Sequence, residues 1–152
     1  LDKESTWTYD KNKMQFVGQD ASVQVLSATK IESPEGQKAI RVHYKLSNTS
    51  KETMNAYALL MKVVLDVKQE KEELKVATMV FSKDDDRDKI ANKTKIGPKE
   101  VKEIVVDYAV SDFDHALIIA FSVYGTEADA TAHISLKNLE NAPVKYFDNK
   151  SQ

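Results

Sequence analysis

Apolar and polar side chains alternate through residues 39–50, which read AIRVHYKLSNTS. The apolar positions are Ile40, Val42, Tyr44 and Leu46, and the polar positions between them are Arg41, His43, Lys45 and Ser47. Successive side chains of a β-strand point to opposite faces, so this period of two predicts a strand with one buried face and one face in water. Parallel sheets are usually covered on both faces, and a half-polar strand therefore indicates an antiparallel sheet.

Other strands are predicted on both sides of this one. Residues 14–17 form a short strand that Gly18 ends, and residues 21–32 form a long one whose alternation slips near Leu26, which indicates a β-bulge. The segment at residues 33–36, Ser-Pro-Glu-Gly, is typical of a turn between antiparallel neighbours. Further strands are predicted at residues 100–110, 116–124 and 131–136, the first two of them central in a sheet because they are apolar on both faces.

Residues 58–75 fit two different structures. Leu60, Val64 and Val67 have helical spacing, and residues 70–75, EKEELK, have high helix propensity. Val63, Val64 and Val67 are β-branched, however, and favour a strand. We predict a hairpin, with strands at residues 58–68 and 74–81 and a charged turn at residues 69–73.

These segments amount to seven or eight strands, which is the pattern of an all-β, antiparallel β-sandwich. A length of 152 residues lies in the range of a single domain. We expect residues 1–13 to be a flexible leader whose last part docks as an edge strand, with Trp7 as a packing anchor. Residues 14–139 are expected to form the sandwich, and residues 140–152 a polar C-terminal tail.

Composition excludes several classes of function. The net charge is −2, and only two of the 22 basic residues, Arg41 and Arg87, are arginines, so nucleic-acid binding is not expected. The chain has no cysteine, which excludes disulfides, thiolate nucleophiles and cysteine zinc sites. No apolar run approaches the roughly 20 residues of a membrane span.

The acidic loop at residues 82–94 contains the candidate metal ligands. Asp84, Asp86 and Asp88 stand at alternate positions, as at the start of a calcium-binding loop. That loop also needs Gly at its sixth position and Glu at its twelfth, where this chain has Lys89 and Lys95. We therefore expect a solvated loop and no metal site, and we keep the three aspartates as the candidates to examine.

No motif indicates catalysis. The only imidazoles, His43, His115 and His133, lack metal-binding spacing. No serine lies in a G-x-S-x-G motif, and the chain has too few glycines for a phosphate-binding loop. A Ser-His-Asp triad needs only to meet in space, so it stays open on sequence grounds. We expect a protein that is not an enzyme and that needs no cofactor.

Three stretches carry a family resemblance: VHYKLSNTSKE at residues 42–52, KIGPKEVKEIVVDYAV at residues 95–110 and ALIIAFSVYG at residues 116–125. Over residues 7–139 the chain resembles immunoglobulin-like domains of unknown function from cell-surface lipoproteins and secreted proteins of Gram-positive bacteria. The resemblance implies an immunoglobulin-like topology and an extracellular location, with membrane attachment through a lipidated cysteine upstream of Leu1. It supplies no catalytic residues.

We therefore expect a non-catalytic, monomeric interaction module of the bacterial cell envelope. Its loops or an edge strand would contact another envelope protein or a cell-wall polymer. The alternative is an ion- or small-ligand-binding domain centred on the loop from Asp84 to Asp88. An interaction module should expose an apolar patch or an open edge strand, whereas an ion site should bring at least three oxygen ligands together.

Overall fold

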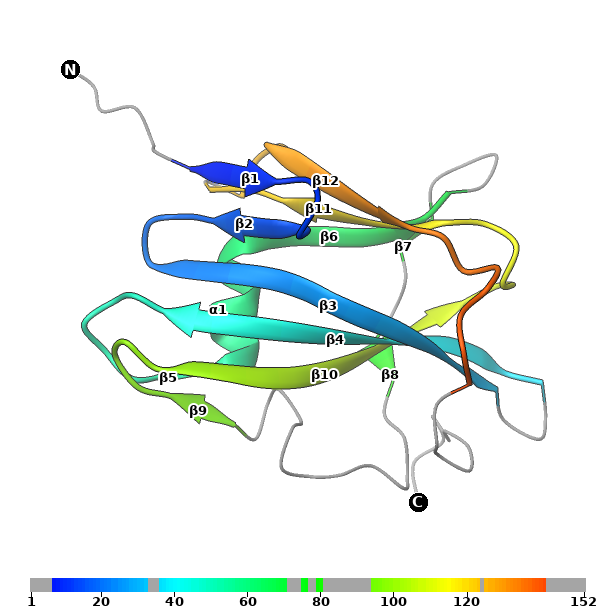
Figure 1. Cartoon of the computed structure of the whole chain (residues 1–152), viewed down its shortest axis with the longest axis horizontal. Coiled ribbons are helices and arrows are strands. Elements are labelled where there is room, and N and C mark those ends of the chain that lie inside the picture. The colour runs from blue at the N-terminus through cyan, green and yellow to red at the C-terminus, as the bar shows by residue number, and fades with distance from the viewer. Residues whose placement is uncertain are drawn as a thin grey trace.

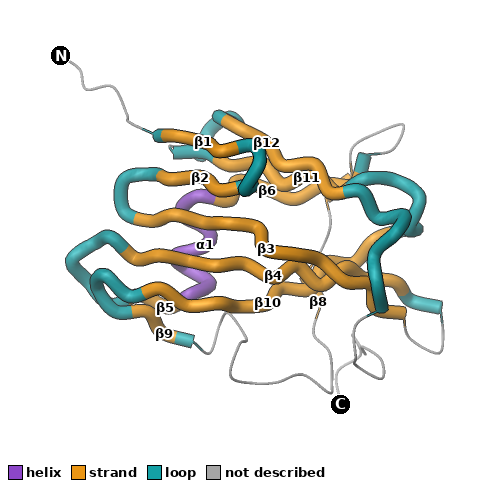
Figure 2. Tube along the Cα trace, viewed as in Figure 1, coloured by secondary structure: helices purple, strands orange, loops and turns teal. Residues whose placement is uncertain are grey.

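The structure is a computed structural model that describes residues 7–32, 36–70, 75–76, 79–80, 94–123 and 125–141. Two antiparallel sheets form its framework (Figures 1 and 2). The first has the order β1-β2-β3-β4-β10-β8, the second has the order β12-β11-β6-β7, and β5 pairs with β9. The elements are β1 (Thr8–Asp10), β2 (Gln15–Val17), β3 (Ala21–Glu32), β4 (Lys38–Asn48), β5 (Met54–Asn55), α1 (Ala56–Val63), β6 (Val64–Gln69), β7 (Lys75–Val76), β8 (Met79–Val80), β9 (Lys95–Ile96), β10 (Val101–Val110), β11 (Leu117–Phe121) and β12 (Ala130–Ile134).

The predicted all-β, antiparallel sandwich is confirmed. Eight of the described strands have three or more residues, in agreement with the seven or eight expected, and four others have two residues each. The immunoglobulin-like topology and the domain boundaries at residues 13 and 139 stay predictions. None of the helical segments in the described part of the chain has the length and apolar character needed to span a membrane.

The alternating strand forms β4, which lies between β3 and β10. Its four apolar side chains, Ile40, Val42, Tyr44 and Leu46, are fully buried in the core. The predicted bulge is also present, because the register of β3 against β4 shifts between Val25 and Ser27. Leu26, the extra residue, is 40% exposed. The hydrophobic pattern therefore predicted both the face and the irregularity of these strands.

The predicted strand at residues 58–68 is wrong in its first half, where the structure has α1. Asn55 caps this helix, since its side chain accepts hydrogen bonds from the backbone amides of Tyr57 and Ala58 at 2.8 and 3.3 Å. The buried side chains have i, i+3, i+4, i+7 spacing and are Ala56, Leu59, Leu60 and Val63. α1 packs against β3 and β4 and continues directly into β6.

The predicted return strand at residues 74–81 is only partly correct. β7 pairs antiparallel with β6, as the hairpin prediction required. β8 instead pairs with β10 in the other sheet, so the chain changes sheets between the two short strands. A continuous β-propensity could not reveal this change, because propensity does not specify the pairing partner.

The remaining strand predictions agree with the structure. β10 lies between β4 and β8, and β11 lies between β12 and β6. Leu117, Ile119 and Phe121 of β11 are fully buried. The last predicted strand, residues 131–136, corresponds to β12 with its bounds shifted toward the N-terminus.

Arg41 is a second correction, because the sequence pattern placed it in water. It is buried on the outer face of the first sheet, directly opposite Asp107 of β10. Its Nε and Nη2 donate to the two carboxylate oxygens of Asp107 at 2.8 and 2.9 Å. The next pair on this face, Ile31 and Ala39, is buried as well. This end of the outer face is therefore covered, although its sequence pattern is half-polar.

Candidate functional site

β1 and β2 form a hairpin at the edge of the first sheet (Figure 1). The turn between them is stabilised by Asp10, whose Oδ1 accepts hydrogen bonds from the backbone amides of Asn12 and Lys13 at 3.0 and 3.2 Å. Met14 completes the turn with a positive φ of 51°. The two strands pair in the register Thr8–Val17, Tyr9–Phe16 and Asp10–Gln15.

Aromatic stacking attaches this hairpin to the second sheet. The ring of Phe16 lies between Trp7 and Phe121, with centroid distances of 5.5 and 5.3 Å. Tyr9 contacts Phe121 as well, at 5.7 Å. Phe16 is fully buried, whereas Trp7 remains 37% exposed. Trp7 thus packs, as expected from the sequence, and also presents apolar surface to solvent.

Among the described residues, no strand pairs with the outer side of β1, which is therefore an open edge of the described sheet. Gly18 N donates to Ala21 O and Val25 N donates to Met14 O, so alternate residues of the β2 segment direct their backbone groups toward β3. By the same alternation, Gln15 and Val17 bond to β1 through their partners Asp10 and Thr8. The backbone N–H and C=O of Tyr9 consequently point away from β2, toward the free edge.

The outer face of the hairpin also carries a shallow depression. Its volume is about 520 Å³, and its lining includes Thr8, Asp10, Lys11, Gln15 and Val17. Val17 is 40% exposed. Open strand edges are normally protected by charges, proline or bulges. Here the charged residues Asp10 and Lys11 stand at one end of β1, and the strand is short, but its other residues, Thr8 and Tyr9, are neither charged nor proline.

The residues singled out from the sequence are the three aspartates of the acidic loop and the three histidines. Asp84, Asp86 and Asp88 lie outside the described residues. His43 is on β4, His115 lies between β10 and β11, and His133 is on β12. No cluster of three or more potential metal ligands occurs in the described ranges.

His115 contacts the carboxylate of Asp112 in the turn between β10 and β11. Its Nδ1 lies 2.9 Å from Asp112 Oδ1. The same oxygen accepts the backbone amides of Asp114 and His115, so Asp112 also stabilises the turn. Gln69, from β6, donates to the backbone oxygens of Asp112 and His115 at 2.9 and 3.1 Å. These hydrogen bonds connect β6 to the turn between β10 and β11, and their role is to stabilise that turn.

Two buried polar pairs that sequence reasoning missed join β4 to β10. Arg41 and Asp107 occupy the outer face, and the Tyr44 and Tyr108 hydroxyls meet at 2.9 Å on the inner face. Burial raises the pKa of both tyrosines above the ordinary value. Opposite charges at directly paired positions of two antiparallel strands could have indicated the Arg41–Asp107 pair. This signal requires the register of β4 against β10, which the sequence does not specify.

Comparison with known proteins identifies the fold and the family. A search of curated protein sequences finds no significant match. The fold is similar to that of a Staphylococcus aureus protein described as a "putative lipoprotein", with a TM-score of 0.77 and 11% identity over 95% of this chain and 100% of that one. It is also similar to the fold of an Enterococcus faecalis protein, with a TM-score of 0.70 and 18% identity over 86% of this chain and 94% of that one. An uncharacterized β-sandwich protein from Clostridium difficile has a TM-score of 0.52 and 11% identity over 88% and 99%.

The family assignment rests on sequence. A family model matches residues 2–123, which include both strands of the edge hairpin, all of β4 and β10, and β11. The matched segment is thus most of the chain and contains the central strands of both sheets. The chain belongs to the family described as Domain of unknown function (DUF5067).

Proposed function

We propose that this domain is a non-catalytic interaction module of the bacterial cell envelope, and that the edge hairpin is its contact surface. The observation that carries the proposal is the open edge of β1, where the backbone N–H and C=O of Tyr9 point outward beside the exposed Trp7. A partner segment in extended conformation could add to this edge as a further strand. Its side chains would then contact Trp7 on one face and the depression at Val17 on the other.

The envelope location is part of the proposal. It is supported by the structural similarity to the Staphylococcus aureus protein described as a "putative lipoprotein". It also agrees with the sequence resemblance to domains of Gram-positive surface lipoproteins. A module held at a membrane surface would meet extended segments of neighbouring envelope proteins at high local concentration.

The absence of catalysis is likewise proposed, and the arrangement of titratable groups supports it. Catalytic sites usually combine a cleft with perturbed acids or bases. Tyr44 and Tyr108, whose pKa values are raised by burial, are enclosed in the core and do not line a cleft. A small cavity beside the end of α1 is lined by glycine, glutamine, aspartate, lysine and aliphatic residues, so neither an imidazole nor a pair of carboxylates is among its described lining.

The proposal can be tested with two substitutions of one residue. Tyr9→Pro removes the outward N–H, and Tyr9→Ala keeps it, while both lose the ring that contacts Phe121. The folded chain would be immobilised through its N-terminus and exposed to envelope extract of a Gram-positive bacterium, and captured proteins identified by mass spectrometry.

Strand addition predicts a captured protein that Tyr9→Ala retains and Tyr9→Pro loses. Circular dichroism would establish that both variants are folded. If both variants capture the same protein equally, the outward N–H of Tyr9 is not used and the edge is not the contact surface. Capture of nothing above background by the unmodified domain would contradict the interaction function itself.

A further inference from the structure

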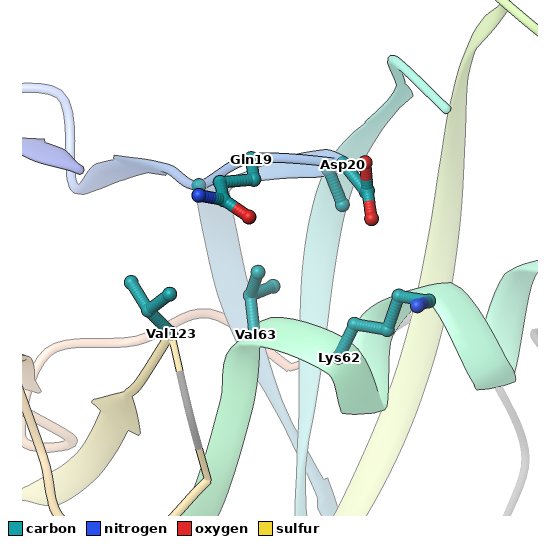
Figure 3. Close-up of a pocket in the computed structure, with 7 residues that line it drawn as sticks. Gln19, Asp20, Lys62, Val63 and Val123 are labelled. Atoms are coloured by element: carbon teal, nitrogen blue, oxygen red, sulfur yellow. The ribbon is translucent and has the colours of Figure 1, made fainter. Parts of the chain in front are cut away.

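A small cavity lies where the β2–β3 turn, the end of α1 and the residues after β11 meet (Figure 3). Its volume is about 120 Å³. In Figure 3, Gln19 and Asp20 lie in the upper part of the view, and Val123, Val63 and Lys62 lie below them from left to right. Three separate parts of the fold therefore contribute its lining.

The walls of this cavity are held by hydrogen bonds that need no ligand. Thr49, which follows β4, donates its backbone N–H to Asp20 O at 2.9 Å and its hydroxyl to Gln19 O at 3.2 Å. Ser122 N donates to Val63 O at 2.8 Å, which fixes the chain before Val123 against the end of α1. The carbonyl oxygens of Gln19, Asp20 and Val63 thus already accept hydrogen bonds from the protein. We therefore expect the side chains around the cavity to determine which ligand binds.

The cavity has a negative and a positive group at its rim. Asp20 and Lys62 are both exposed, and among the described residues no ion pair involves either of them. Lys62 lies in the last turn of α1, and Asp20 lies in the turn between β2 and β3. An ammonium group is therefore favoured near Asp20, and a carboxylate near the ammonium of Lys62.

Two aliphatic side chains, Val63 and Val123, also line the cavity. Val63 is 4% exposed, and Val123 is half-buried beside it. Two valine side chains give a surface suited to a methyl group and offer no hydrogen bond to a polar one. Gln19 supplies one amide that can donate and accept.

We propose that this cavity binds a small zwitterion, a free α-amino acid with a side chain no larger than a methyl group. The ammonium would contact Asp20, the carboxylate Lys62, and the methyl group Val63 and Val123. Size supports this class, because an apolar cavity of about 150 Å³ holds benzene, a molecule of six non-hydrogen atoms. Alanine also has six. The proposal goes beyond the edge interaction and uses none of its residues.

Amide chemical shifts measured by NMR during titration test the proposal directly. The probes are alanine, acetate, methylamine and leucine, each added to the unmodified, uniformly labelled chain. We expect alanine to produce saturable shifts at the amides of residues 18–21, 62–63 and 123. Acetate and methylamine carry only one of the two charges, and leucine exceeds the volume, so each should bind at least about tenfold more weakly than alanine.

Charge variants locate the two contacts. Lys62→Gln and Asp20→Asn should each weaken alanine binding by about tenfold or more, as expected when one charge-assisted hydrogen bond is lost. Lys45→Gln, which changes an exposed lysine on the outer face of β4, is the matched control and should leave the affinity unchanged.

The alternative outcomes are distinct. Acetate binding as tightly as alanine would show a carboxylate site and overturn the zwitterion proposal. Equal binding of leucine would contradict the size limit set by the valines. Absence of saturable shifts at these amides, in a chain whose spectrum is that of the folded domain, would overturn the site altogether.

Discussion

The first sheet has a firmly held centre and an open edge. At the centre, β4 and β10 pair over ten residues and carry buried polar contacts on both faces. At the edge, β1 and β2 pair over three residues, and two of the molecule's exposed large apolar side chains, Trp7 and Val17, are found there. The contrast indicates that stability and binding depend on different strands. The enclosed central strands determine stability, and the surface available for binding lies at the edge, where a substitution removes few packing contacts. The central strands should accept few substitutions without unfolding, and the edge should accept many without loss of stability.

The largest effect is expected at the ion pair of the centre. Asp107→Asn should lower the free energy of unfolding by about 3–5 kcal/mol, because it removes the buried negative charge that accepts hydrogen bonds from Nε and Nη2 of Arg41. Urea denaturation measures the change. The double variant Arg41→Met, Asp107→Leu should recover most of the loss. A single variant as stable as the unmodified chain would show that this pair does not hold the centre.

The tyrosine pair should contribute less. Tyr108→Phe removes one hydroxyl of the buried pair and leaves that of Tyr44 without this partner. We expect a loss of about 1–3 kcal/mol in the free energy of unfolding. Tyr44→Phe, Tyr108→Phe together should cost less than the single change, because no hydroxyl of the pair then remains in the core. A double variant less stable than either single one would contradict a contribution through the hydroxyl pair.

Alkaline pH tests the same pair without mutation. Burial raises the pKa of Tyr44 and Tyr108 in the folded chain, whereas both have ordinary values near 10 when unfolded. The stability linked to this shift is fully present below pH of about 10, and it falls as pH rises further because the unfolded chain loses these protons first. The slope of unfolding free energy against pH, measured by denaturation, should be smaller in the double phenylalanine variant. Equal slopes would show that the pair does not govern the alkaline limit.

The edge should show a smaller effect on stability. Trp7→Ala removes a ring that stacks on Phe16 but is already 37% exposed, so the expected loss is about 1 kcal/mol. Thermal unfolding followed by circular dichroism would measure it. A loss as large as that of Asp107→Asn would remove the contrast between edge and centre.

Sequence reasoning succeeded where local pattern determines structure. The alternation of β4 predicted its buried face, and the slip in phase near Leu26 predicted a bulge. It failed at α1, because the β-branched valines were taken to favour a strand over the helical spacing, and the buried set of the helix begins earlier, at Ala56. Asn55 was the missing signal, since a capping residue followed by that set describes a short helix.

The candidate site was less predictable than the fold. The acidic residues Asp84, Asp86 and Asp88 attracted notice because they are close together in sequence, and they lie outside the described residues. The cavity at Asp20 and Lys62 joins residues far apart in the chain, which no spacing rule could bring together. The ion pair of Arg41 and Asp107 likewise depends on strand register, which the pattern of either strand alone does not specify.

One measurement tests the role of the edge most directly. Val17 and Val101 occupy the same row of the outer face, connected through Ser22 and Ser47, and are 40% and 51% exposed. Val17→Lys and Val101→Lys are therefore matched changes at the edge and at β10. The dissociation constant of each variant for the captured partner, measured by biolayer interferometry, should rise about tenfold or more for Val17→Lys and stay unchanged for Val101→Lys, with equal thermal stability. Equal affinities for the two variants would contradict the account.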